Sequence, residues 1–290
     1  MFRVAGVRQS VPAQSVTTPP LGCRPGRGAA RRDLAGTATA LGGLVLLTAG
    51  EAVRARHRYG RAPSAVAAVD VTLEPRGGAA ADADTTEMAA FGDSAMAGVG
   101  VRAAEETLPV QIAQRVADGT GRPVHVVGYA VSGARTRDVR THQLPTLRRV
   151  PDVSVLVVGT NDVTHMARLD TLQRETEVLL DALTASGRSV VMSSLPEFWA
   201  MRALGHPLRA MAHGYGSLVR QVHRRAAAGR SGVTLVDVCG SVGWEFVTDP
   251  ATMSADRFHP SARGYGRIAD AMAPAVVAAL SGISTAGESR

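Results

Sequence analysis

The stretch EMAAFGDS, residues 87–94, is a short apolar run that ends in a Gly-Asp-Ser turn. An apolar run of this length, bounded by a turn signal, predicts a buried β-strand. Ser94 would then lie at the carboxyl end of that strand, and the small residues of AMAGVG (residues 95–100) would leave room for a substrate. Taken alone, the tripeptide is also compatible with a turn that caps a helix. Met96 occupies the position of the second glycine in the G-x-S-x-G elbow, which disfavours an ordinary α/β-hydrolase.

Short β-branched runs alternate with longer amphipathic runs through most of the remaining chain. The predicted strands are 87–91, 124–127, 153–158, 190–193 and 233–238. The predicted helices are 108–117, 169–185, 208–228 and 261–280. Strands that alternate with helices form a parallel sheet covered on both faces. The sequence therefore predicts an α/β fold, a three-layer α/β/α sandwich of flavodoxin-like type with a parallel five-stranded sheet.

Three further blocks of glycine and polar residues follow predicted strands or precede the last predicted helix. They are Gly133, after the second strand; Gly159-Thr160-Asn161-Asp162, after the third; and Asp256-Arg257-Phe258-His259-Pro260, before the last helix. In open parallel sheets, ligand sites lie at the carboxyl ends of the strands. We therefore expect these blocks to meet Ser94 in one site.

The residue types in these blocks are those that acyl transfer requires. Ser94 offers a hydroxyl nucleophile, His259 a base that activates it, and Asp256 a carboxylate that orients the base. A spacing of three residues lets the carboxylate reach the imidazole within one turn of chain. Pro260 disfavours helical angles at His259, so we expect the histidine on a loop at the start of the final helix. A surface histidine with an acidic neighbour is usually structural, and the order and completeness of the blocks carry the catalytic interpretation.

Two other residues are candidates for stabilising an oxyanion. Gly133 would let a backbone N–H approach the developing charge, although a turn with positive φ would equally require glycine. Asn161 would donate from a neutral amide, although an Asx-turn is the ordinary role of asparagine after a strand. We expect Asp162 to brace its loop and His165 to begin the next segment.

These residues resemble the four signature blocks of the SGNH, or GDSL-type, esterases and lipases, in the family's order and across roughly residues 87–280. The resemblance implies the SGNH hydrolase fold, a triad of Ser94, His259 and Asp256, and no cofactor. It also implies an oxyanion hole made by the backbone N–H groups of Ser94 and Gly133 and the side chain of Asn161. Many relatives have asparagine five positions before the second-block glycine, where this chain has Gly128. That departure concerns the bracing of the loop.

The expected function is hydrolysis of carboxylic esters through an acyl-enzyme, with short-chain acyl or acetyl esters of lipids or glycans as substrates. Two alternatives remain at this point: an acyltransferase that uses the same triad, and a non-catalytic, membrane-tethered glycan-binding protein. The stretch LPEFWAM (residues 195–201) follows the fourth predicted strand, and it lines a substrate pocket or packs on the sheet. Trp199 is the candidate substrate contact within it, whereas we expect Trp244 in the core.

Charge and cysteine content argue against other classes of function. The net charge is +7, but residues 1–62 contribute a net +8, which leaves −1 for the remainder. All 32 basic residues are arginine, and no basic stripe interleaved with aromatic residues is present, so we expect no nucleic-acid partner. Cys23 and Cys239 are too far apart in sequence to suggest a metal motif or a disulfide framework. We predict no metal and a monomer.

The predicted organisation is an Arg-rich arm (1–33), a hydrophobic segment (34–53), a linker (54–85), the esterase domain (86–282) and a tail (283–290). Leu34 to Gly50 are uncharged and mostly apolar, with arginines on both sides. Because a bilayer core requires about 20 apolar residues, this run is marginal for a membrane anchor. A cleaved signal peptide and a soluble helix are the alternatives. We expect a membrane-anchored or secreted protein with an extracytoplasmic catalytic domain, with a cytoplasmic protein as the alternative.

Overall fold

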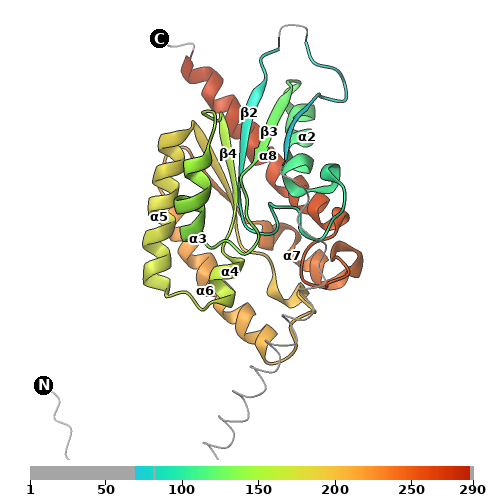
Figure 1. Cartoon of the computed structure of the whole chain (residues 1–290), viewed down its shortest axis with the longest axis vertical. Helices are drawn as coiled ribbons and strands as arrows, with labels where there is room; N and C mark the ends of the chain where they lie inside the picture. The colour runs from blue at the N-terminus through green and yellow to red at the C-terminus, as the bar shows by residue number, and fades with distance from the viewer. Residues whose placement is uncertain (1–68, 81–82, 288–290) are drawn as a thin grey trace, which may run out of the picture. The chain divides into compact units, whose positions relative to one another are not determined.

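The computed structural model describes residues 69–80 and 83–287, and these form a sheet with helices on both faces (Figure 1). The strands are β1 (Asp70–Leu73), β2 (Thr86–Gly92), β3 (Val124–Gly128), β4 (Val153–Val157), β5 (Ser189–Ser193) and β6 (Val233–Val236). The α-helices are α2 (Leu108–Thr120), α3 (Thr136–Asp138), α4 (Thr160–Thr164), α5 (Leu169–Ser186), α6 (Leu208–Ala227), α7 (Val238–Thr248) and α8 (Ala262–Gly287). Short 3₁₀ turns lie at Ala104–Glu106 (η1), Leu144–Thr146 (η3), Phe198–Ala200 (η4) and Pro250–Thr252 (η5), and Val139–Gln143 (η2) is a π-helix.

The strand order is β1-β3-β2-β4-β5-β6, and every pair except β1–β3 is parallel. The predicted five parallel strands are therefore confirmed. The antiparallel edge strand β1 lies within residues 54–85, which the sequence assigned to a linker. Its first three residues are exposed, so the strand lacks the apolar alternation that marks a half-buried strand. Backbone pairing with β3, from Asp70 opposite Val127 to Leu73 opposite Val124, forms this strand instead.

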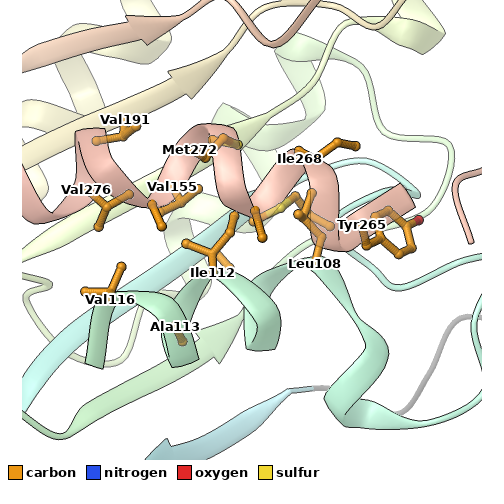
Figure 2. Close-up of a cluster of buried hydrophobic side chains, with 14 of the residues drawn as sticks. Leu108, Ile112, Ala113, Val116, Val155, Val191, Tyr265, Ile268, Met272 and Val276 are labelled. Carbon is orange, nitrogen blue, oxygen red and sulfur yellow. The ribbon is translucent and has the colours of Figure 1, made fainter. Parts of the chain in front are cut away.

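Alternation along β2 explains why helices cover both faces of the sheet. Met88 and Ala90 belong to a core cluster with α2, α7 and α8, whereas Ala89 and Phe91 belong to a second cluster with α5 and α6. Successive side chains of a strand point to opposite faces, so a strand that is apolar at every position requires cover on both sides. Figure 2 shows the first cluster, in which residues of α2 and α8 pack against Val155 of β4 and Val191 of β5.

The main difference from the predicted elements is α7. The apolar run from Val233 predicted a strand as far as Val238, but β6 ends at Val236. Asp237 then caps a helix, because its side chain accepts a hydrogen bond from the backbone N–H of Gly240. Trp244, which we expected in the core, lies on this helix and is 74% exposed. The helix presents Val238, Val242 and Phe246 to the core instead.

The strand order also positions the candidate site. From β2 the chain crosses to β3 on one side and then returns to β4 on the other side of β2. The loops after β3 and β4 therefore diverge on either side of the loop after β2, which is the topological switch point where ligands bind in open α/β sheets. Gly133, Ser94 and Asn161 follow these three strands.

Several predictions concern residues outside the described part of the chain. The arm at 1–33, the hydrophobic segment at 34–53 and Cys23 lie there, as do the last residues of the tail at 283–290. Across residues 69–80 and 83–287, no helix is long and apolar enough to cross a bilayer.

Candidate active site

Ser94 follows β2 in a turn that the surrounding backbone holds tightly. Gly92 has φ of 148°, and a Cβ atom there would collide with the carbonyl oxygen of Val157 on β4. Asp93 N donates to that same carbonyl at 3.1 Å. Only glycine permits this close approach between strand and turn, and the approach determines where the next residues lie.

Gln143, a buried residue of η2, reinforces this turn. Its Nε2 donates to the Gly92 carbonyl at 2.7 Å, and its Oε1 accepts from the Gly92 N–H at 3.0 Å. A side-chain amide is a group that can both donate and accept in this way. Gln143 could not be identified from sequence, because no pattern in the chain indicates that a residue 51 positions away contacts Gly92.

A continuous chain of hydrogen bonds joins Asp256, His259 and Ser94. His259 Nδ1 lies 2.6 Å from Asp256 Oδ2, and His259 Nε2 lies 3.0 Å from Ser94 Oγ. With Asp256 ionised, Nδ1–H donates to the carboxylate, which leaves Nε2 to accept from the serine hydroxyl. The structure thus brings together the nucleophile, base and carboxylate that the sequence predicted, in the order that serine activation requires.

The loop around Asp256 favours its ionised form. The other carboxylate oxygen, Oδ1, accepts from Ser254 Oγ at 2.7 Å and from the backbone N–H groups of Phe258 at 2.8 Å and His259 at 2.9 Å. Burial alone would raise the pKa of Asp256, but the hydrogen bonds from His259, Ser254 and Phe258 together lower it to about 2. The carboxylate is therefore charged at neutral pH and accepts a hydrogen bond from His259 Nδ1.

His259 lies on the loop before α8, and the loop folds back on itself. Ser254 N donates to the carbonyl of His259 at 2.9 Å, and Met253 forms an isolated antiparallel bridge with Pro260. Arg257 has φ of 58°, which tightens the turn between the carboxylate and the imidazole. Contacts within this loop therefore fix the spacing of Asp256 and His259, and these contacts do not involve Ser94.

The loops that carry Gly133 and Asn161 contact each other. Asn161 Nδ2 donates to the carbonyl of Ala134 at 3.0 Å, and Val131 N donates to the Gly92 carbonyl at 3.2 Å. Gly133 has φ of 87°, and a Cβ atom there would meet nothing within 4 Å. Glycine is therefore favoured there by backbone conformation and not by close packing. Asn161 retains a second N–H on its amide, which is available to a ligand.

Asp162 braces these two loops, as the sequence analysis expected. Its Oδ2 accepts from both the backbone N–H and the hydroxyl of Thr136, each at 2.9 Å. These contacts hold the loop of Gly133 although position 128 is glycine. His165 ends the short helix α4, with its Nδ1 2.7 Å from the Asn161 carbonyl, and it contacts neither Ser94 nor His259 by any hydrogen bond found among the described residues.

Two buried groups next to the site have displaced pKa values. Burial raises the pKa of Asp93 to about 7, and its Oδ2 has no hydrogen-bond partner among the described residues. His223 of α6 is fully buried beside Gly159, and burial lowers its pKa to about 4. Neither group was selected from sequence, because a displaced pKa depends on burial, which the local pattern does not report.

A pocket opens beside Ser94 and His259. It is lined by Pro196, Glu197, Ala200 and Met201 from the stretch that the sequence analysis selected as a candidate pocket wall. Trp199 is not among the lining residues. Its ring lies between His206 and His213, with centroid distances of 5.5 and 5.2 Å, and the guanidinium of Arg209 lies 5.7 Å from its centroid. Within residues 69–80 and 83–287, no group of three or more His, Cys, Asp or Glu residues could hold a metal ion.

Comparison with known proteins finds matches across the region that carries these residues. The model of the GDSL-like lipase/acylhydrolase family matches residues 90–267. A GDSL-like esterase of Mycobacterium tuberculosis is 31% identical over 183 residues, which are 62% of this chain and 58% of that protein. The chain thus spans somewhat more than half the length of this curated relative.

Solved structures of similar fold include two lipases, one from a bacterium and one from a metagenome. An extracellular lipase from Streptomyces rimosus aligns with a TM-score of 0.53 and 22% identity, over 67% of this chain and 99% of that chain. A lipase from a goat rumen metagenome aligns with a TM-score of 0.54 and 17% identity, over 66% of this chain and 97% of that chain. At these identities the likeness establishes the fold.

Proposed function

We infer, because this chain belongs to the GDSL-like lipase/acylhydrolase family, that it is a serine esterase that hydrolyses carboxylic esters through an acyl-enzyme. The observation that carries the inference is the hydrogen-bonded chain from Asp256 through His259 to Ser94. Family membership supports the class of reaction, and the contacts support the role of each residue. The donors on the loops of Gly133 and Asn161 supply the remaining requirement, which is stabilisation of negative charge.

The first half-reaction acylates Ser94. Its Oγ attacks the ester carbonyl carbon while His259 Nε2 accepts the hydroxyl proton, and Asp256 stabilises the resulting imidazolium through Nδ1–H. The carbonyl oxygen becomes an oxyanion that accepts from the backbone N–H groups of Ser94 and Gly133 and from the amide of Asn161. Collapse of this intermediate breaks the bond to the alcohol oxygen, which leaves with the proton from His259.

The second half-reaction regenerates the enzyme. Water attacks the acyl carbon as His259 Nε2 accepts a proton from it, and the same donors hold the second oxyanion. The bond to Ser94 Oγ breaks, the carboxylic acid is released, and the proton returns from His259 to the serine. The proton transfers use Ser94, His259 and Asp256, which are hydrogen-bonded to one another in the structure, and Asp256 stays ionised throughout because the pKa of that carboxyl is about 2.

The physiological substrates proposed here are short-chain or acetyl esters of lipids or glycans. Residues 34–53 are further proposed to tether the catalytic domain outside the cytoplasm, on the basis of their apolar composition and flanking arginines. Fractionation of cells that express the full-length chain tests the tether. We expect the protein in the membrane fraction, released by detergent, and recovery in the soluble fraction without detergent would contradict the proposal.

The experiment that tests the activity compares the full-length protein with Ser94→Ala on p-nitrophenyl acetate. We expect the variant to lose at least about 10³-fold in kcat, since the nucleophile is removed. Ser186→Ala is a matched control, because the hydrogen bond that Ser186 Oγ makes among the described residues goes to the Ala182 carbonyl within α5. Retention of the wild-type rate by Ser94→Ala, with hydrolysis above the uncatalysed rate, would assign the reaction to another residue.

A further inference from the structure

The pocket beside Ser94 lies between the carboxyl ends of β4 and β5 and the three segments η4, α7 and α8. The nucleophile and base line one end of it, and Val238, Val242 and Phe246 line the side formed by α7. Ala200 of η4 and Ile268 of α8 complete the apolar wall. The catalytic pair therefore borders a mostly apolar space.

Glu197 and Ser194, two polar residues of this pocket, are engaged with other protein groups, whereas Oδ2 of Asp93, which also lines it, has no hydrogen-bond partner among the described residues. The Oε1 atom of Glu197 lies 2.7 Å from His213 Nδ1 and accepts from the Trp199 N–H at 3.1 Å. Ser194 Oγ donates to Asp237 Oδ1 at 3.1 Å. Among the described residues, no arginine lines the pocket, and Asp93 and Glu197 place carboxyl groups there, so the lining disfavours an anionic ligand group. Its chemistry suits a hydrocarbon chain.

The alternative use of the pocket, for the alcohol part of the ester, fits the reaction less well. The acyl carbon stays bonded to Ser94 Oγ through both half-reactions, whereas the alcohol must leave before water can attack. A recessed pocket next to the nucleophile can retain the acyl chain throughout. The alcohol and the incoming water both require the solvent side of His259, because Nε2 exchanges a proton with each of them.

The size of the pocket limits the chain that it can hold. Its cavity volume is about 70 Å³. An engineered apolar cavity of about 150 Å³ holds benzene, which has six carbon atoms. On that scale the pocket has room for about three carbons beyond the carbonyl, which corresponds to acyl groups from acetyl to butyryl.

The wall formed by α7 is firmly anchored, so the pocket exists before substrate binds. Glu245 on α7 accepts from Arg267 of α8 through both carboxylate oxygens, at 2.7 and 2.8 Å. Gly264 of α8 provides space for the ring of Phe246, because a Cβ atom there would lie 3.0 Å from the ring and would collide with the Thr252 carbonyl. A wall held in this way cannot retreat freely to admit a longer chain.

We propose that this pocket binds the acyl group of the ester and restricts it to about four carbons, with Val242 of α7 as a residue that determines chain length. The assignment rests on the proposed esterase function. Val242 is 7% exposed and lines the same pocket as Ser94. The substrate class is therefore short-chain carboxylic esters, and the alcohol part is recognised outside this pocket.

The test measures kcat/KM of the full-length protein for p-nitrophenyl esters from acetate to decanoate. We expect kcat/KM of the wild-type enzyme to fall about 10-fold or more between butyrate and octanoate. One methylene group that the pocket cannot accommodate changes kcat/KM by about that factor or more. Val242→Ala removes two methyl groups from the wall and should raise the hexanoate-to-acetate ratio about 10-fold. Ala200→Leu adds bulk to the part of the lining that η4 forms and should lower the butyrate-to-acetate ratio by a similar factor.

Val276→Ala is the matched control. Val276 is a fully buried residue of α8 in the same core cluster, but it does not line the pocket, so its loss of the same two methyl groups should leave both ratios unchanged. Thermal unfolding of each variant distinguishes a change of pocket from a loss of fold, and Ala200→Leu serves as the test if Val242→Ala does not fold. Unchanged ratios in the folded pocket variants, or a flat wild-type profile, would overturn the assignment. Absence of hydrolysis across the whole series would instead overturn the esterase function and the assignment with it.

Discussion

His259 Nε2 lies 3.0 Å from Ser94 Oγ, although 165 positions separate the two residues. Two independently fixed segments meet at this contact. Ser94 is held by the turn at Gly92, which Gln143 and the Val157 carbonyl restrain. His259 is held by Asp256 and the loop before α8. The contact between Ser94 and His259 therefore depends on how the loop before α8 packs against the sheet, because the two residues are not close in sequence.

Removal of the charge on Asp256 should abolish most of the activity without unfolding the domain. Asp256→Asn can still accept at one oxygen, but its amide no longer favours the tautomer with the proton on His259 Nδ1. We expect kcat to fall by about 10³- to 10⁴-fold in steady-state assays with p-nitrophenyl acetate. Asp249→Asn is the control, because Asp249 also caps a short turn through a backbone N–H but does not contact His259. A fall in kcat of less than about 10-fold for Asp256→Asn would show that the carboxylate does not assist His259 in the reaction.

Asn161 is the only asparagine in the chain, and its side chain bridges to the loop of Gly133. Asn161→Ala removes the bridge to Ala134 together with the remaining amide N–H. We expect kcat to fall by about 10²-fold or more with a smaller change in KM, which is typical of a donor that acts in the transition state. The measurement is a full rate–concentration curve for each enzyme. A kcat within about twofold of wild type would exclude Asn161 from the oxyanion site.

Asp162 should act as a positioning residue through Thr136. Asp162→Ala removes two hydrogen bonds to that residue, whereas Thr136→Val removes only the hydroxyl donor and keeps the backbone N–H. We therefore expect kcat to decrease in the order wild type, Thr136→Val, Asp162→Ala, with about 10-fold or more lost in the last. Urea unfolding should show a parallel loss of about 1–3 kcal/mol for Asp162→Ala. Equal kcat values despite that destabilisation would assign Asp162 a purely structural role.

The edge strand β1 should be held more weakly as pH rises. His125 lies 2.7 Å from Glu87 Oε2 and 2.9 Å from Asp70 Oδ1, with Arg149 and Arg148 also near these carboxylates. The hydrogen bond to Glu87, more than the one to Asp70, raises the pKa of His125 above 6.5. Its contribution to stability is therefore complete below pH 6.5 and is lost as pH rises through the elevated pKa.

Hydrogen exchange of the β1 amides from pH 5 to 9, corrected for intrinsic rates, measures this effect. We expect protection to decrease with pH in the wild type and to lose that dependence in His125→Gln. His142→Gln is the control, because its side chain is 73% exposed. If protection of the β1 amides still decreases with pH in His125→Gln, another group is responsible for the pH dependence.

His223 should make the domain sensitive to acid. Both of its ring nitrogens lack hydrogen-bond partners among the described residues, and burial lowers its pKa to about 4 from 6.5. The unfolded state binds a proton more tightly, so stability falls as pH decreases from about 6.5 toward 4. A shift of that size corresponds to about 3 kcal/mol at most. His223→Leu should retain more stability at pH 4.5 relative to pH 7.5 in urea unfolding than the wild type does, and an unchanged difference would contradict this account.

Much of the fold could be predicted from the chain because the signals are local. The apolar run before Ser94 and the β-branched runs that follow it require cover on both faces, and their alternation with amphipathic runs predicts a parallel sheet between two layers of helices. Asp256 and His259 could be paired because three positions separate them. The edge strand β1 and the start of α7 were missed, because β1 depends on pairing with β3 and α7 begins within an apolar run.

The amino-acid pattern was enough to indicate which residues are available for acyl transfer and which ends of the strands carry them. The tertiary structure decided which of these residues meet, what braces them and how large the adjoining pocket is. Three features join segments that are far apart in the chain. They are the hydrogen bonds between Gln143 and Gly92, those between Asp162 and Thr136, and the pocket that α7 lines together with Ser94. The physical reason is that patterns along a chain report burial and turning within one segment, whereas hydrogen-bond geometry, displaced pKa values and cavity volume depend on distances between segments.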